Sequence, residues 1–348
     1  METYLQEKKQ EALTSINDIL FPLLRNGLYE DRAPEMIPQL SAGQWDELLE
    51  TAQQQTVAGI MYHGLSRLGT AYAVPTDVTF RLVAEANRIE QESKRKEAVA
   101  WQEFQRMKEE GLHPIVMKGP AIARHYPTPH LRVSGDIDIY LRGDEFHKVR
   151  ASLGDKVELA DGSVHYACQG VDFDLHDKYF DLYLPESRLP AVPSPYATLL
   201  MLSAHIFKHA SGPGIGLRQL CDMAVAYHKL DFEPEALLET YRRAGLLKWN
   251  VLLYSFLRKY LGLKDIFGDS IQPVPPETLL AIIEEGGNFG HYEQSRKAAL
   301  SGETRERKID TAKRYLKRLP FALKYAPREA SRYFLDLVLG NLKKKNPS

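Results

Sequence analysis

The chain has 348 residues, of which 44% are apolar and 26% are charged, and its formal net charge is −1. These values are typical of a globular protein with two or three packed units, and the near-neutral balance points to no particular partner. The two cysteines, Cys168 and Cys221, lie far apart and do not support a zinc cluster or a disulfide framework.

The first residues are charged and lack the apolar core of a signal peptide. No apolar run approaches the ~20 residues that a membrane span requires. We therefore expect a cytoplasmic protein.

Residues 1–110 are predicted to be helical. Their first apolar residues recur at i, i+3, i+4 and i+7, and Pro22 interrupts this pattern, so we expect a kink or a restart there. Ser41 begins a capping box that opens a second helix. A long helical stretch then runs from about Asp77 to Glu110 and stops at Gly111, a suitable C-cap.

After Gly111 the apolar pattern changes to the period of two that is typical of strands. The expected strands are 114–118, 136–141, 164–168 and 171–176, the last two joined by a turn at Gln169-Gly170. Short helices are expected at 121–125 and 145–153. This order predicts a small mixed sheet within a mainly helical chain, an α+β fold.

The chain becomes helical again near Ser194-Pro195, an N-cap followed by proline at the first helical position. We expect three regions: a helical region at 1–110, an α/β core at 111–192 and a helical domain at 193–348. From Arg305 onward there are 13 Lys or Arg residues against 4 Asp or Glu residues. This basic tail is interpreted as a solvated helix surface; nucleic acid or an anionic membrane surface is a less favoured partner.

Carboxylates alternate with apolar residues on two of the expected strands. Asp136 and Asp138 share one face of the first strand, and Asp172, Asp174 and His176 share one face of the second. If these strands pair, like charges converge, and such a site requires a cation. Mg²⁺ or Mn²⁺, which accept carboxylate and phosphate oxygens, fit that need.

Several short motifs occur in a definite order: Met117-Lys118-Gly119, Tyr126-Pro127, Arg132, Asp136-Ile137-Asp138, Asp174-Leu175-His176, and then His205, His209, Arg218 and Asp222. Over residues 80–260 this order resembles the uncharacterised bacterial nucleotidyltransferase family of the DNA polymerase β superfamily. The resemblance implies a metal-dependent enzyme that transfers a nucleoside monophosphate from a nucleoside triphosphate to a hydroxyl acceptor, whether a small molecule, a glycan precursor or a protein.

By this resemblance Asp136 and Asp138 would bridge two metal ions, and Asp174 would ligate the metal that activates the acceptor and could take its proton. One departure concerns Gly119, which is followed by Pro120 where the superfamily usually has a residue with an amide for the phosphates. Phosphate contact would then pass to Lys118 or another cation. Asp172 competes with Asp174 for the third carboxylate.

Two further residues have two interpretations each. Lys118 could contact phosphate or pair with a carboxylate, and Arg132 could clamp phosphate or hold the proline-rich loop in place. Lys208 and its neighbour His209 are candidate nucleotide contacts.

Two more expectations concern supporting residues. Arg218 and Asp222 are expected to form an ion pair within a helix. His176 is expected to support the surroundings of Asp174.

Two other functions remain open on the sequence. The chain could be a non-catalytic nucleotide-binding or scaffold protein on a degenerate transferase fold, which the Pro120 substitution favours. It could also be an RNA-modifying transferase that uses the basic tail, which is the least favoured of the three functions.

Overall fold

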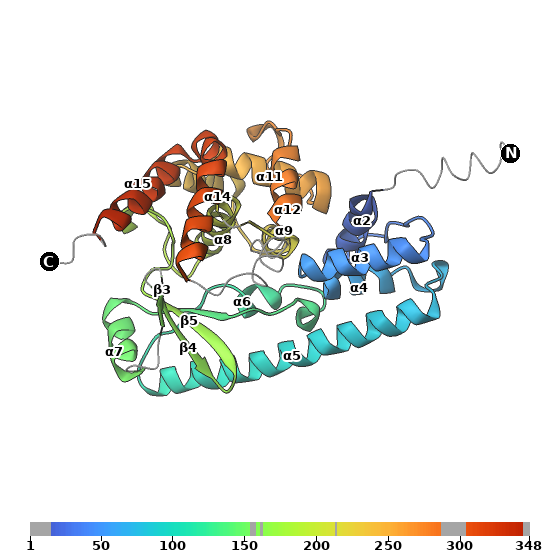
Figure 1. The fold of residues 1–348 in the computed structure, drawn as a ribbon, viewed down its shortest axis with the longest axis horizontal. Helices are drawn as coiled ribbons and strands as arrows, with labels where there is room; N and C mark the ends of the chain where they lie inside the picture. The colour runs from blue at the N-terminus through green and yellow to red at the C-terminus, as the bar shows by residue number, and fades with distance from the viewer. Residues whose placement is uncertain (1–14, 154–157, 161–162, 213, 287–303, 344–348) are drawn as a thin grey trace.

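A computed structural model describes residues 15–153, 158–160, 163–212, 214–286 and 304–343. The predicted α+β architecture is confirmed: a small mixed sheet lies between one long helix and a large group of helices (Figure 1). The N-terminal helices are α2 (Ile16–Leu28), α3 (Ala42–Gln54), α4 (Ala58–Ser66) and α5 (Thr76–Glu109). The central region contains β1 (Ile115–Val116), α6 (Pro120–Ala123), β2 (Ile137–Tyr140), α7 (Gly143–Leu153), β3 (Glu158–Ala160), β4 (Ser163–Cys168) and β5 (Val171–His176). The C-terminal helices are α8 (Pro195–Ala210), α9 (Leu217–Lys229), α10 (Pro234–Ala244), α11 (Leu247–Leu261), α12 (Glu277–Gly286), α14 (Thr304–Tyr325) and α15 (Pro327–Lys343).

The sheet has the strand order β1-β2-β5-β4-β3. β2 and β5 are parallel neighbours, whereas the other three pairs are antiparallel. The expected hairpin is confirmed: β4 and β5 are joined at Gln169 and Gly170, both of which have positive φ angles, 48° and 69°. Two consecutive residues of this kind are typical of the tight turn that suits the twist of a β-hairpin.

One face of the sheet is apolar and is covered by helices. Val99, Ala100 and Met107 of α5 and Phe146 and Val149 of α7 pack on it. The buried strand residues of this cluster are Ile137, Ile139, Val164, Tyr166, Val171, Phe173 and Leu175. Because side chains alternate along a strand, the polar residues of β2 and β5 must point to the opposite face.

The long helix α5 connects the N-terminal helices to the sheet. It has 34 residues, so at ~1.5 Å per residue it is about 50 Å long. It runs along one side of the molecule, from beside α4 to the apolar face of the sheet (Figure 1). Gly111 follows it with φ +76°, as expected for a C-cap.

The N-terminal and C-terminal helices share one hydrophobic core. Buried residues of α2 to α5 and of α8 to α12 belong to the same cluster, including Leu23, Trp45, Leu200 and Trp249. The region boundaries near residues 110 and 192 stay predictions. The restart expected at Pro22 does not occur: α2 is continuous through this proline, and its residues on both sides of Pro22 are buried.

The loop that leads to the carboxylates rests directly on α4. A Cβ atom at Gly59 would lie 2.0 Å from the carbonyl oxygen of Leu131, so only glycine permits this contact. The N-terminal helices therefore help to set the path of the chain into β2.

Among the helices that the structure describes, none combines the length and apolar character needed to cross a membrane.

Candidate metal and nucleotide site

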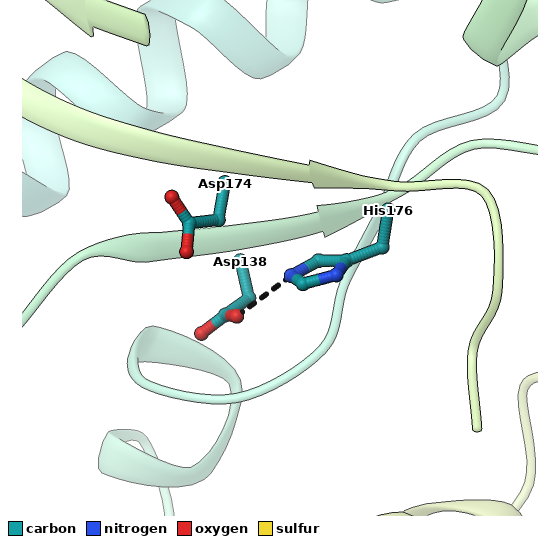
Figure 2. A group of neighbouring side chains, drawn as sticks. All are labelled: Asp138, Asp174 and His176. Carbon is teal, nitrogen blue, oxygen red and sulfur yellow. Dashed lines mark hydrogen bonds and ion pairs between the residues drawn. The ribbon is translucent and has the colours of Figure 1, made fainter. Parts of the chain in front are cut away.

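Two carboxylates lie side by side on the polar face of the sheet. Because β2 and β5 are parallel and in register, Asp138 is the direct partner of Asp174, and Tyr140 is the partner of His176. Asp138, Asp174 and His176 each offer a ligand atom, and these atoms all lie within 4.8 Å of one another. Figure 2 shows the two carboxylates on neighbouring strands, with the imidazole of His176 turned toward Asp138.

Asp138 is a buried carboxylate, 6% exposed, that is held in its ionised form. Its Oδ1 atom lies 2.7 Å from Lys118 Nζ and 2.9 Å from His176 Nε2. Burial opposes ionisation, but the Lys118 ammonium and the His176 hydrogen bond outweigh it, so the pKa of Asp138 is lowered to about 2.

Asp174 is in the opposite electrostatic state. Burial and the negative charges of Asp136 and Asp138 raise its pKa to about 6, and the contact between its Oδ1 atom and His165 Nδ1 only partly offsets them. A carboxylate whose negative neighbours disfavour its ionisation gains most from a nearby cation. The donor set, two carboxylates and an imidazole beside a third carboxylate, therefore suits a divalent metal ion.

Asp136 and Asp172 lie outside this compact group. Asp136 is exposed and precedes β2, although its charge still acts on Asp174. Asp172 is exposed and pairs in register with Ala167 of β4. Of the two candidates for the third carboxylate, Asp174 has the position beside Asp138.

Lys118 and Gly119 stand at the end of β1, next to the carboxylates. Lys118 was expected either to contact phosphate or to pair with a carboxylate, and in the structure it forms an ion pair with Asp138. Gly119 has φ +51°, a conformation that favours glycine, and a Cβ atom there would lie 3.6 Å from the carbonyl oxygen of Asp136. Pro120 is the first residue of the short helix α6. Because proline has no backbone N–H group, it cannot donate a hydrogen bond to a phosphate there.

Arg132 is 4% exposed and is bound to Asp222 of α9 rather than open to the site. Its Nε and Nη2 atoms donate to the two carboxylate oxygens at 2.7 and 2.6 Å, and the Tyr126 hydroxyl donates to Asp222 Oδ1 at 2.7 Å. This bidentate contact favours the reading in which Arg132 holds the proline-rich loop in place.

The expected ion pair between Arg218 and Asp222 is not the contact that the structure shows. Asp222 is engaged by Arg132, whereas Arg218 Nη1 donates to the carbonyl oxygen of Val133 at 3.0 Å. An (i, i+4) spacing favours an ion pair on an exposed helix, but α9 is buried, and a partner from the loop takes the carboxylate. Arg218 thus supports the loop before Asp136.

His205 and His209 of α8 are half-buried, and their rings lie 4.4 Å apart. Burial and the charge of Lys118 lower the pKa of His209 to about 3, and they lower that of His205 as well, so both imidazoles are neutral at pH 7. Lys208 Nζ lies 2.5 Å from Asp181 Oδ2. These contacts place His209 near Lys118, and Lys208 at the segment that follows β5.

Two residues of the site were absent from the sequence-based prediction. His165 of β4 contacts Asp174, and its Nε2 atom lies 2.9 Å from Ser163 Oγ. Lys96 of α5 donates to the carbonyl oxygens of Ser134 and Gly135 at 3.2 and 3.1 Å. The predicted two-residue turn pairs His165 with Asp174, so the position of His165 could have been predicted from the sequence. No local sequence pattern predicts the contact that Lys96 makes with the loop before β2.

No curated protein and no solved structure matches the chain significantly. A family model described as "Uncharacterised nucleotidyltransferase" matches residues 41–262, which is more than half of the chain. The match includes β1, β2, β5 and the helices α8 and α9, from which the residues of the site come. It also begins further toward the N-terminus than residue 80, the start of the resemblance seen in the motifs. The chain belongs to this family of uncharacterised nucleotidyltransferases.

Proposed function

We propose that this protein is a metal-dependent nucleotidyltransferase that moves a nucleoside monophosphate from a nucleoside triphosphate to a hydroxyl acceptor. The observation that carries the proposal is the pair Asp138 and Asp174 on adjacent parallel strands, in a chain of a nucleotidyltransferase family. We further propose that the sheet is of the DNA polymerase β type, because of the order in which its motifs occur along the chain.

Asp136, Asp138 and Asp174 are the proposed metal-binding residues. The ligand atoms of Asp138, Asp174 and His176 lie within 4.8 Å of one another, and Asp136 directly precedes β2. When bound, Mg²⁺ or Mn²⁺ would neutralise the phosphate charges and make the acceptor hydroxyl easier to deprotonate. Asp138 is already ionised, because Lys118 and His176 hold its pKa at about 2. Asp174 becomes ionised near neutral pH, because its pKa is about 6.

Asp174 is also the proposed general base. His165 contacts its Oδ1 atom, which leaves Oδ2 to accept the proton of the acceptor hydroxyl. A cation bound beside Asp174 would favour its ionised form, which is the form that can take a proton. His165 would keep the carboxylate in one orientation during the transfer.

Lys118 is the proposed phosphate contact. Its ammonium has three donors, so it can release Asp138 and turn toward a phosphate when another cation neutralises that carboxylate. Gly119 allows the backbone to approach the same space.

Three further residues complete the proposed nucleotide contacts. His209 is a neutral neighbour of Lys118, and Lys208 is a cation that the nucleotide would have to draw away from Asp181. For Arg132 we propose an indirect part, because its bond to Asp222 orients the loop that precedes Asp136 and Asp138.

A non-catalytic, nucleotide-binding protein is the second candidate. The ion pair between Lys118 and Asp138 favours it, because that pair already neutralises a buried carboxylate without a metal, and Pro120 removes an amide from the phosphate region. Both candidates predict that nucleotide binds, but only the first predicts turnover.

The test is to incubate the protein with each labelled nucleoside triphosphate, Mg²⁺ or Mn²⁺, and cell extract, and to search for a labelled product. Asp138→Asn is the test variant, because it keeps the size of the side chain and removes the charge. Asp172→Asn is the matched control, because Asp172 lies on the same strand face but outside the compact group. A product with the parent and the control but not with Asp138→Asn supports the enzyme. Nucleotide binding without any product supports the second candidate.

A further inference from the structure

The two last helices carry an exposed stripe of basic and leucine side chains. On α14 the exposed positions recur at helical spacing along one face, and α15 adds exposed positions at a similar spacing. We call it the basic–leucine face; its members are Lys313, Leu316, Lys317, Leu323, Lys324, Arg328, Arg332 and Leu335. The side chains of Leu316, Leu323 and Leu335 are 54%, 41% and 52% exposed, and they account for three of the seven large apolar residues that are exposed in the described chain.

We call residues 313–335 of α14 and α15 the helical hairpin, and the charge of this segment is strongly one-sided. Residues 313–335 contain seven Lys or Arg residues and a single acidic residue, Glu329, which is buried. Lys317 pairs with Glu285, and Arg318 is buried against the carbonyl oxygens of Ala210 and Gly212.

Three cations of the basic–leucine face stay available to a partner. Lys313, Lys324 and Arg328 are exposed, and the ion pairs seen between described side chains in this region involve Lys317 and Arg318 instead. The outward charge of the hairpin is therefore positive and calls for an anionic partner.

The leucines decide between two anionic partners. Phosphates of nucleic acid would pair with the lysines but would leave the leucines exposed to water. The headgroup region of an anionic bilayer binds both kinds of side chain, because basic side chains pair with lipid phosphates while leucines enter the acyl boundary. Leu316 and Leu323 are seven residues apart on one helix face and alternate with Lys313, Lys317 and Lys324, which is the pattern of a surface-bound amphipathic helix.

The hairpin is fixed to the body of the protein, so a bound surface would have a defined position. The Tyr315 hydroxyl of α14 donates to the carbonyl oxygen of Ala330 in α15 at 2.8 Å. Tyr183, in the segment that follows β5, donates its amide to Glu329 Oε2 at 3.0 Å. The basic–leucine face is thus connected to the chain that leaves the candidate site.

We propose that the basic–leucine face binds the surface of anionic phospholipid bilayers. The proposal is independent of nucleotidyl transfer, since it rests on α14 and α15 and its test requires no turnover.

The experiment measures co-sedimentation of the full chain with vesicles of phosphatidylcholine alone and of phosphatidylcholine with 30% phosphatidylglycerol. One variant removes charge (Lys313→Gln, Lys324→Gln, Arg328→Gln), and its control removes three exposed charges elsewhere (Lys108→Gln, Arg243→Gln, Lys248→Gln). A second variant removes the leucines (Leu316→Ser, Leu323→Ser), and its control is Phe80→Ser, an exposed apolar residue of α5.

We expect the parent to bind the anionic vesicles only, and less well as salt increases. Each basic residue near such a surface is worth about fivefold in affinity, so the charge variant should bind on the order of a hundredfold more weakly than its control. The leucine variant should bind roughly tenfold more weakly than Phe80→Ser.

Four results would overturn the proposal. The parent could fail to bind anionic vesicles, or each variant could bind like its control. Nucleic acid could bind in a manner that the charge variant weakens and the leucine variant does not, while vesicles do not bind. The parent could also be a dimer that the leucine variant dissociates, which would assign the face to a second copy of the chain.

Discussion

The Lys118 ammonium lies 2.7 Å from Asp138 Oδ1, so a cation of the protein already neutralises the buried carboxylate of the candidate site. Asp174, the neighbour of Asp138 across the parallel strands, has no ammonium partner among the residues that the structure describes, and its pKa is raised. The site therefore contains one carboxylate that is stabilised as an anion and one that is not.

Removing the Lys118 charge should destabilise the protein in the absence of metal. Breaking a buried ion pair costs about 3 kcal/mol, so Lys118→Met should lower the free energy of unfolding by about that amount in EDTA. Urea denaturation gives the measurement. Lys94→Met, which breaks an exposed pair with Glu90, should cost less than about 0.5 kcal/mol. If the two variants lose the same stability, Lys118 is not essential to the charge balance of the site.

Asp174 should make the stability of the metal-free protein decrease as pH rises. Its pKa is about 6 in the folded protein and 3.8 in a free side chain, so the folded state binds the proton more tightly. This contribution is fully present below pH 4 and is lost as pH rises through 6. Asp174→Asn should therefore be more stable than the parent at pH 8 by about 2 kcal/mol. This value is the free energy of a shift of about two pKa units, reduced by the free energy of the lost hydrogen bond to His165.

Thermal or urea unfolding in EDTA at pH 4 and pH 8 tests this prediction. At pH 4 the variant should have no advantage over the parent. Asp172→Asn, on the same strand face, serves as the control and should show no such change between the two pH values. A parent that is as stable as Asp174→Asn at pH 8 would show that the neighbouring carboxylates do not disfavour ionisation of Asp174.

Much of the sheet and its carboxylates could be predicted because both depend on local patterns. Alternation along each strand placed Asp138 and Asp174 opposite the apolar face, and Gln169-Gly170 set the hairpin. The partner of Arg132 could not be predicted in this way, because Asp222 is 90 residues away and only the packing of α9 brings it close. The shared core of the first and last helices is equally a result of long-range packing.

Arg132 and Asp222 should act as one unit. Arg132→Lys loses the bidentate geometry and Asp222→Asn loses the charge, so each should destabilise the protein by roughly 3 kcal/mol. The double variant should cost much less than the sum, because both changes break the same contact.

Enzyme kinetics then separate the two readings of Arg132. If Arg132 positions the loop, both single variants should lower kcat with similar effects on KM for the nucleotide. If Arg132 contacts phosphate directly, only Arg132→Lys should raise that KM strongly. The second outcome would contradict the positioning role proposed above.

The central claim is that Asp138 and Asp174 together form a metal site that a nucleotide completes. Calorimetric titration of Mn²⁺ in the presence of a non-hydrolysable nucleoside triphosphate tests it most directly, because Mg²⁺-type sites borrow phosphate ligands. We predict that the parent and Asp172→Asn bind Mn²⁺ alike, whereas Asp138→Asn and Asp174→Asn bind at least about tenfold more weakly. If all four proteins give the same isotherm, the carboxylates do not form a metal site and the proposed mechanism is wrong.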